Sequence, residues 1–183
     1  LDAQPVVPSR IGSSAYLAPL GNSVELTHTD LRHRSPTINL MAGIDTVLHL
    51  AANVGGLAYN LGHSAEIFDA NMRVDMNILH AATRAGVDRV LLCSSACVYP
   101  RFCSIPTPEE EGFEGVPEPT NAGYGWSKRM LEFLGATYAD EHGLSVAIVR
   151  PYNTYGPRDR FDPNRSHVIP ALILKALEAG DDE

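Results

Sequence analysis

The chain alternates short apolar runs with longer amphipathic segments, which is the pattern of a parallel sheet covered by helices. Four runs are short enough to be strands, at residues 24–27, 46–50, 89–93 and 145–150. The runs at 46–50 and 90–93 are almost continuously apolar, as is typical of strands buried on both faces. We therefore expect the last three strands to lie side by side in one parallel sheet.

The segments between these runs predict helices that each carry one apolar stripe. Residues 65–85 place apolar side chains three and four positions apart, and residues 120–142 do the same. A last helix is predicted to begin near His167. The sequence therefore predicts an α/β fold with a doubly wound, Rossmann-like parallel sheet.

Two long loops, rich in proline and polar residues, interrupt this alternation at residues 99–119 and 151–166. Each follows a predicted strand. Loops at the carboxyl ends of strands carry the functional groups in α/β proteins, so we expect the site between these two loops.

Composition and charge exclude several classes of protein. With 183 residues, 44% of them hydrophobic, the chain can bury one sizeable core but is short for two full domains. Its 14 basic and 22 acidic residues give a net charge of -8 without a basic run, which argues against nucleic acid as a partner. No apolar run approaches the roughly 20 residues that cross a bilayer, so no membrane association is expected.

The three cysteines, Cys93, Cys97 and Cys103, form neither a CxxC pair nor a cluster with histidines at zinc-binding spacing. The sequence thus indicates neither a disulfide framework nor a metal site. A reducing cytoplasm is the simplest location for such a protein.

The strongest local motif is Tyr124-Gly-Trp-Ser-Lys128, inside a predicted helix. A spacing of four residues places the phenol and the ammonium on one helix face. A nearby cation favours phenolate and should lower the tyrosine pKa toward a range useful for proton exchange with a sugar hydroxyl. Because both residues are common, a surface helix that happens to contain them is the alternative for this motif alone.

A second candidate lies upstream in Leu91-Leu-Cys-Ser-Ser-Ala-Cys-Val-Tyr-Pro100, where a strand passes into a loop. Ser95 is at the carboxyl end of this strand and could hydrogen-bond a reacting oxygen beside Tyr124. Serines at a strand end also cap the backbone, and that structural role is the one we expect for Ser94.

The order of these motifs, followed by Arg150-Pro-Tyr-Asn-Thr-Tyr-Gly-Pro157, resembles the extended short-chain dehydrogenase/reductase family over residues 30–179. Within it, the chain is most similar to the GDP-L-fucose synthase and GDP-mannose 3,5-epimerase groups. Both share the element seen here as Ala51-Ala-Asn-Val-Gly-Gly56. The synthases also share Pro119-Thr-Asn121 and Ser166-His-Val-Ile-Pro-Ala-Leu172.

This resemblance implies that Ser95, Tyr124 and Lys128 transfer hydride with a nicotinamide cofactor. It also implies that Cys97 and His167 are an acid/base pair at the sugar carbons beside a keto group. A 4-keto group acidifies the protons on C3 and C5, so a thiol and an imidazole could invert these centres. The alternatives are that Cys97 is a packing residue and that His167 simply begins a helix.

The cofactor implied is NAD or NADP, with NAD favoured because an acid at Asp2 would bind the ribose hydroxyls after the family's second strand. Further contacts are implied with the adenine edge, the nicotinamide side and the substrate. For the cofactor they are Asp30, Leu31, Leu50, Ala51, Ala52, Tyr124, Lys128, Pro151 and Asn153, and for the substrate Asn153 and Lys175. A solvated helix residue is the alternative for Lys175.

The sequence has no GxxGxxG or GxGxxG turn to hold a pyrophosphate. By resemblance, the first strand and helix would precede Leu1, residues 1–150 would form the rest of a dinucleotide-binding domain, and residues 151–183 would begin a nucleotide-sugar-binding region. We expect the longer protein to be an epimerase-reductase of GDP-linked sugars and a homodimer that pairs through helices 65–85 and 120–142. Other sugar epimerases or dehydratases, and a non-catalytic dinucleotide-binding module, are the alternatives.

Overall fold

The computed structural model describes residues 5–9, 18–157, 159, 161–162 and 166–179. Its centre is a three-stranded parallel sheet in the order β3-β4-β5, formed by Thr46–His49, Arg89–Cys93 and Ser145–Val149. In register, Leu91 of β4 lies between Leu48 of β3 and Ala147 of β5. The predicted α/β fold and its parallel sheet are confirmed.

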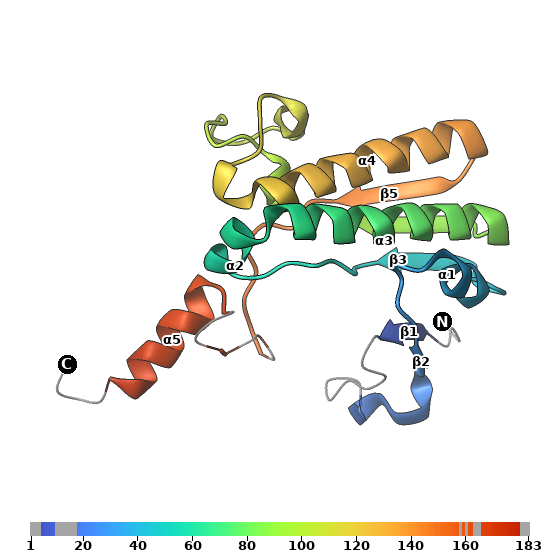
Figure 1. Ribbon diagram of the computed structural model, residues 1–183, viewed down its shortest axis with the longest axis horizontal. Helices are drawn as coiled ribbons and strands as arrows, with labels where there is room; N and C mark the ends of the chain where they lie inside the picture. Colours follow the sequence, from blue (N-terminus) through green and yellow to red (C-terminus); the bar gives the residue numbers. More distant parts are fainter. Residues whose placement is uncertain (1–4, 10–17, 158, 160, 163–165, 180–183) are drawn as a thin grey trace.

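Two long helices cover one face of this sheet (Figure 1). They are α3, Ser64–Ala85, and α4, Ala122–His142, and they pack against each other along their length. Each helix leads directly into the next strand, so the carboxyl ends of the strands meet the start of α4. Gly86 ends α3 with φ 72°, a left-handed conformation that costs glycine little because it lacks a Cβ.

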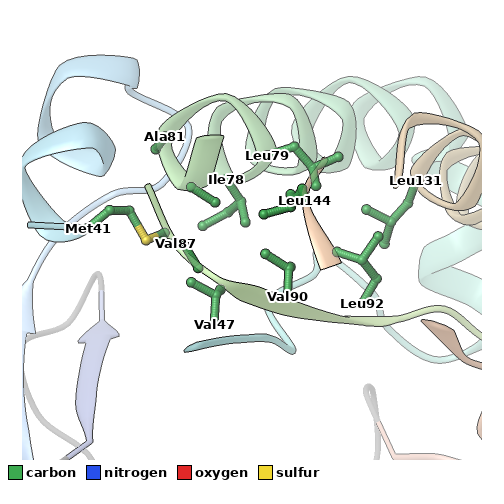
Figure 2. Close-up of a cluster of buried hydrophobic side chains, with 11 residues drawn as sticks. Met41, Val47, Ile78, Leu79, Ala81, Val87, Val90, Leu92, Leu131 and Leu144 are labelled. Atoms are coloured by element: carbon green, nitrogen blue, oxygen red, sulfur yellow. The ribbon is translucent and has the colours of Figure 1, made fainter. Parts of the chain in front are cut away.

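The hydrophobic core lies between these helices and the sheet (Figure 2). Val47, Val90 and Leu92 point from the strands toward Leu79 and Leu131 of the helices. The three leucines are completely buried. Alternate strand residues face the helices, as the pleat requires. The shorter helix α1, Arg34–Leu40, closes one end of this core through contacts with α3.

The amino-terminal part forms a separate two-stranded parallel sheet of β1, Val6–Ser9, and β2, Glu25–His28. Strand β2 lies one residue later than predicted. Strand β1 was not predicted, because it is only four residues long and includes Pro8, which has no N–H to donate to a ladder.

Several short elements also escaped prediction because they are too short to show a period. They are helix α2, Leu57–Gly62, and the 3-10 turns η1, Ala18–Ser23; η2, Ala96–Val98; η3, Glu109–Phe113; and η4, Pro119–Asn121. The predicted carboxyl-terminal helix is α5, Val168–Glu178, which begins directly after His167.

The opposite face of the central sheet is open in the part of the chain that the structure describes. Leu48 and Leu50 are 64% and 65% exposed, and Val149 is 43% exposed. The expectation that these strands are buried on both faces was therefore wrong for this chain. A continuously apolar strand can be buried on both faces of a sheet. Among the described elements, however, α3 and α4 cover only one of the two faces.

Candidate active site

The motif residues Tyr124 and Lys128 lie on the first turns of α4, beside the carboxyl end of β4. Lys128 is buried, and its Nζ donates a hydrogen bond of 2.8 Å to the carbonyl oxygen of Cys93. The same Nζ lies 5.6 Å from the centroid of the Tyr124 ring. Lys128 therefore joins the helix to the strand end while its charge stays next to the tyrosine.

Ser95 follows β4, and its side chain caps the next turn. Its Oγ accepts a hydrogen bond of 3.1 Å from the backbone N–H of Cys97, which caps the turn η2. The Ser95 side chain also lowers the pKa of Tyr124, against the rise that burial causes. Ser94 has a purely structural role, because it is buried and donates to the Glu132 carboxylate on α4.

The electrostatics of Tyr124 differ from the expectation drawn from the motif. Burial raises the pKa of Tyr124 to about 12, negative charge at Cys97, Cys93 and Asp75 adds to this rise, and only the Ser95 hydrogen bond opposes it. Burial also lowers the pKa of Lys128, whose ammonium is engaged with Cys93. In this state Tyr124 is a neutral phenol, which is the form that donates a proton to a keto oxygen.

Cys97 lies in η2, on the same side of the sheet edge as Tyr124. The turn approaches α4 closely, since a Cβ added at Gly125 would come within 2.5 Å of the Cys97 carbonyl oxygen. Glycine at this position therefore lets the thiol-bearing turn pack beside the tyrosine. Cys97 is a free, partly buried thiol and is not part of the apolar core.

The carboxyl-terminal candidates lie elsewhere. His167 is exposed and precedes α5, where its carbonyl oxygen accepts the first helical hydrogen bond from Ala171. Lys175 is exposed farther along that helix. Figure 1 shows α5 projecting away from the sheet.

A cleft of about 800 Å³ runs from the ends of β1 and β2 to the loop after β3. Of the predicted cofactor contacts, Asp30, Leu31, Ala51 and Ala52 line it. The Asp30 carboxylate pairs with Arg32 at 2.6 Å, and this hydrogen bonding holds its pKa well below the usual range. Leu50, Pro151 and Asn153 are exposed at the carboxyl edge of the sheet and do not line this cleft.

Asp2 lies outside the described residues. The strand paired with β2 is β1, which begins at Val6, so its carboxyl end is at Ser9. An acid that binds ribose has to follow such a strand. The preference for NAD over NADP therefore stays a prediction.

Amide side chains outside the sequence motifs position the loop that follows β3. Buried Asn71 on α3 accepts from the Asn53 backbone N–H at 2.6 Å and donates to the Asn53 carbonyl at 3.1 Å. It also donates to Ser127 on α4. Asn60 accepts from the Gly55 N–H. The detectable signal was an uncharged polar residue within an apolar helix face.

A buried acid and histidine were also missed. His49 on β3 and Asp75 on α3 lie 2.7 Å apart, and each side chain is 1% exposed. Both stand in segments whose periodicity predicts apolar contacts, so their polarity at core positions was the available signal.

Two arginines fasten the loop of residues 99–119 over this corner. Arg150, at the end of β5, pairs with Glu132 at 2.7 Å and donates to the Tyr99 hydroxyl at 3.1 Å. Arg129 on α4 donates to three backbone carbonyls, those of Val98, Glu114 and Gly115. These contacts hold the loop against the helix that carries the Tyr124 motif.

Among the described residues, no group of three or more His, Cys, Asp or Glu side chains could hold a metal ion. In the same part of the chain, every helix is too short or too polar to traverse a bilayer.

Comparison with known proteins identifies relatives of this arrangement. The chain is 36% identical over 152 residues to GDP-L-fucose synthase of Dictyostelium discoideum, an alignment that covers 82% of this chain and 48% of the relative. It is 38% identical over 172 residues to dTDP-4-dehydro-6-deoxy-D-allose reductase of a Streptomyces species, covering 92% of this chain and 52% of the relative. The chain thus spans about half the length of these relatives.

A solved structure shows the same fold. A GDP-L-fucose synthetase from Naegleria fowleri, bound to NADP, superimposes with a TM-score of 0.75 at 31% identity, covering 90% of this chain and 53% of that one. The model of the NAD dependent epimerase/dehydratase family matches residues 6–183, almost the whole sequence. The chain therefore belongs to the NAD dependent epimerase/dehydratase family.

Proposed function

We propose that the whole protein epimerises and reduces a GDP-linked 4-keto sugar with NAD or NADP. The observation that carries this proposal is the cluster at the end of β4, where Ser95, Tyr124 and Lys128 lie together with the Cys97 thiol. Hydride-transfer and proton-transfer groups thus share one corner. The fucose synthases among the relatives support this combination.

The residues present fit the two ends of a dinucleotide. The cleft has a volume typical of cofactor sites. Of the residues that line it, Asp30 and Leu31 would hold the adenine end, and Ala51 and Ala52 would lie toward the nicotinamide. The sequence contains no glycine-rich turn for the pyrophosphate. When bound, the nicotinamide supplies or accepts the hydride.

The chain's own residues then stabilise the negative charge that develops on the C4 oxygen. Tyr124 donates its proton to the keto oxygen, and Ser95 hydrogen-bonds the same atom. The ammonium of Lys128 favours the phenolate that remains. Asn153, exposed after β5, and Lys175 on α5 are proposed to contact the sugar nucleotide.

Epimerisation needs a second pair of groups. Cys97 is proposed to remove a proton beside the keto group, because its thiol lies at the Tyr124 corner and can reach the same sugar ring. His167, which precedes α5, is proposed as the partner acid. The domains proposed are residues 1–150 for the dinucleotide and 151–183 toward the sugar.

A simple 4-keto reductase is the second candidate. The allose reductase relative covers 92% of this chain and acts, by its name, on a dTDP-linked sugar. Such an enzyme needs Ser95, Tyr124 and Lys128 but no acid/base pair at C3 and C5. The behaviour of Cys97 therefore separates the two candidates.

The test uses the whole protein in heavy water, with GDP-linked and dTDP-linked 4-keto sugars and either NADH or NADPH. We expect deuterium at C3 and C5 of the GDP-linked sugar, detected by mass spectrometry. Cys97→Ser should lower this exchange about 100-fold, since serine is far less acidic than a thiol, while reduction of an already epimerised sugar continues.

Cys103→Ser is the matched control, because Cys103 lies in the loop and contacts Thr107. It should leave the exchange unchanged. Undiminished exchange in both Cys97→Ser and His167→Ala would reduce both residues to packing roles and favour another sugar epimerase or dehydratase. No exchange in the wild-type protein would reject the epimerase and leave the reductase.

We also propose that the whole protein is a homodimer that pairs through α3 and α4. Both helices carry apolar side chains at least 37% exposed on their outer surfaces, which are Phe68, Met76, Trp126 and Phe133. Exposed apolar side chains on neighbouring helices are typical of a protein interface.

A further inference from the structure

The His49 and Asp75 pair lies in the layer between β3 and α3. His49 Nε2 and Asp75 Oδ1 are 2.7 Å apart, and both side chains are buried from solvent. The other carboxylate oxygen, Asp75 Oδ2, is buried and has no hydrogen-bond partner among the described residues. A carboxylate with one oxygen unpartnered is costly to bury unless a positive charge lies near.

Lys128 is a source of positive charge in the same layer, because Asn71, one turn before Asp75 on α3, donates to Ser127, which precedes Lys128 on α4. His49 is also in register with Leu92, which precedes Cys93 on β4.

The Lys128 ammonium uses one of its three N–H donors on the Cys93 carbonyl, at 2.8 Å. The Asp75 charge raises the pKa of Lys128 against the lowering caused by burial, and it raises the pKa of Tyr124 as well. Asp75 therefore interacts electrostatically with both motif residues.

We propose that Asp75, held by His49, is a positioning residue that supplies the buried counter-charge for Lys128 and keeps its ammonium protonated beside Tyr124. The inference deepens the proposed function, on which its rate measurements rest. Asp75 touches neither the substrate nor the cofactor in this scheme and acts through Lys128. The titratable groups in the cluster are His49 from β3, Cys93 from β4, and Tyr124 and Lys128 from α4.

The sign of the effect follows from the charges. Burial lowers the pKa of Lys128, and the Asp75 charge partly opposes this lowering. Without that charge, the ammonium should release its proton at a lower pH. The same change lets Tyr124 ionise at lower pH. Since keto reduction needs a charged Lys128 and a protonated Tyr124, the alkaline limb of the rate profile should move toward lower pH.

Asp75→Asn removes the charge while keeping the shape and an oxygen that can face His49. The first measurement is an NMR titration of the whole protein with labelled lysine, in which the Lys128 signal is assigned by its loss in Lys128→Arg. We expect the Lys128 midpoint to fall by about one pH unit in Asp75→Asn. Exposed Lys175 is the internal reference and should not move.

The second measurement is the pH profile of keto reduction, whose alkaline limb should fall by a similar amount. Asp140→Asn removes an equal charge from an exposed position on α4 and should change neither measurement. His49→Gln retains an N–H toward Asp75, so it should shift the Lys128 midpoint less than Asp75→Asn does.

The outcomes separate this inference from the proposed function. An unchanged Lys128 midpoint in Asp75→Asn, with only a lower unfolding temperature, would reduce the pair to a structural role even if the wild type reduces sugars. A lower Lys128 midpoint in Asp75→Asn, combined with a wild-type protein that reduces no 4-keto sugar, would support the charge pairing and reject the proposed function.

Discussion

The two faces of the central sheet are built from alternate residues of the same strands, yet only one is covered by described helices. Val47 is buried under α3, whereas its neighbour Leu48 is 64% exposed. The covered face carries the core, the buried ion pairs and the helix with the Tyr124 motif. Helix packing, and not strand composition, therefore decides where this chain can hold charged groups in fixed positions.

The same comparison explains the division within the candidate site. Lys128 and Ser95 are fixed by hydrogen bonds to backbone atoms on the covered side. His167 lies at the start of α5, which has an exposed and largely apolar surface. For the stability of the fold, we expect substitutions on the covered side to have larger effects than substitutions on the open side.

The largest effect is expected from Tyr124→Phe in the whole protein. The variant lacks the proton donor, so keto reduction should slow by about 100- to 10,000-fold, the usual contribution of a general acid. Epimerisation, followed as deuterium uptake, should continue. Stopped-flow measurement of nicotinamide oxidation reports the rate.

Tyr138→Phe, on the later part of α4, is the matched control and should reduce at the wild-type rate. If Tyr124→Phe reduced the keto sugar at the wild-type rate, the cluster at the end of β4 would not be the hydride-transfer site.

The next effect concerns stability and compares the two faces directly. Leu131 is completely buried, so Leu131→Ala should lower the free energy of unfolding by about 2–5 kcal/mol. Leu48→Ala, on the open face, should cost much less because it leaves no cavity. Urea unfolding of this chain, followed by circular dichroism, measures both. Equal losses would show that the open face is covered in solution.

The smallest effect separates a buried ion pair from an exposed one. Glu132→Gln leaves the Arg150 charge without its partner under the loop. It should lower the free energy of unfolding by about 2–4 kcal/mol, a range that already allows for the partial exposure of Arg150. Asp69→Asn breaks the surface pair with Arg73, whose side chains are both about 60% exposed, and should leave the unfolding midpoint unchanged.

A salt series adds a check on this pair of variants. High salt should leave the loss in Glu132→Gln largely intact, since buried charges are screened little. A loss that disappeared at high salt would mean that the Arg150 pair behaves like a surface contact.

Much of the architecture was predictable because its elements are long or strongly patterned. The helices α3 and α4 and the strand β4 lie within two residues of their predicted bounds. The elements that were missed, such as β1 and α2, are four and six residues long. Such lengths carry too few positions to reveal a period.

The site was predictable only as a set of residue types at given positions. The spacing of Tyr124 and Lys128 follows from the helix, and the place of Ser95 from the strand end. The electrostatics did not follow. A lowered tyrosine pKa was expected from the lysine, but burial raises the pKa of Tyr124 to about 12.

The sequence by itself determined the alternation of strands and helices and the order of the motifs, because both are local properties of neighbouring residues. Only the tertiary structure decided which face of the sheet is covered, that Asp75 meets His49, and that α5 projects away from the sheet. These facts depend on contacts between residues far apart in the chain. Burial and charge at a site are sums over such contacts, so no local pattern contains them.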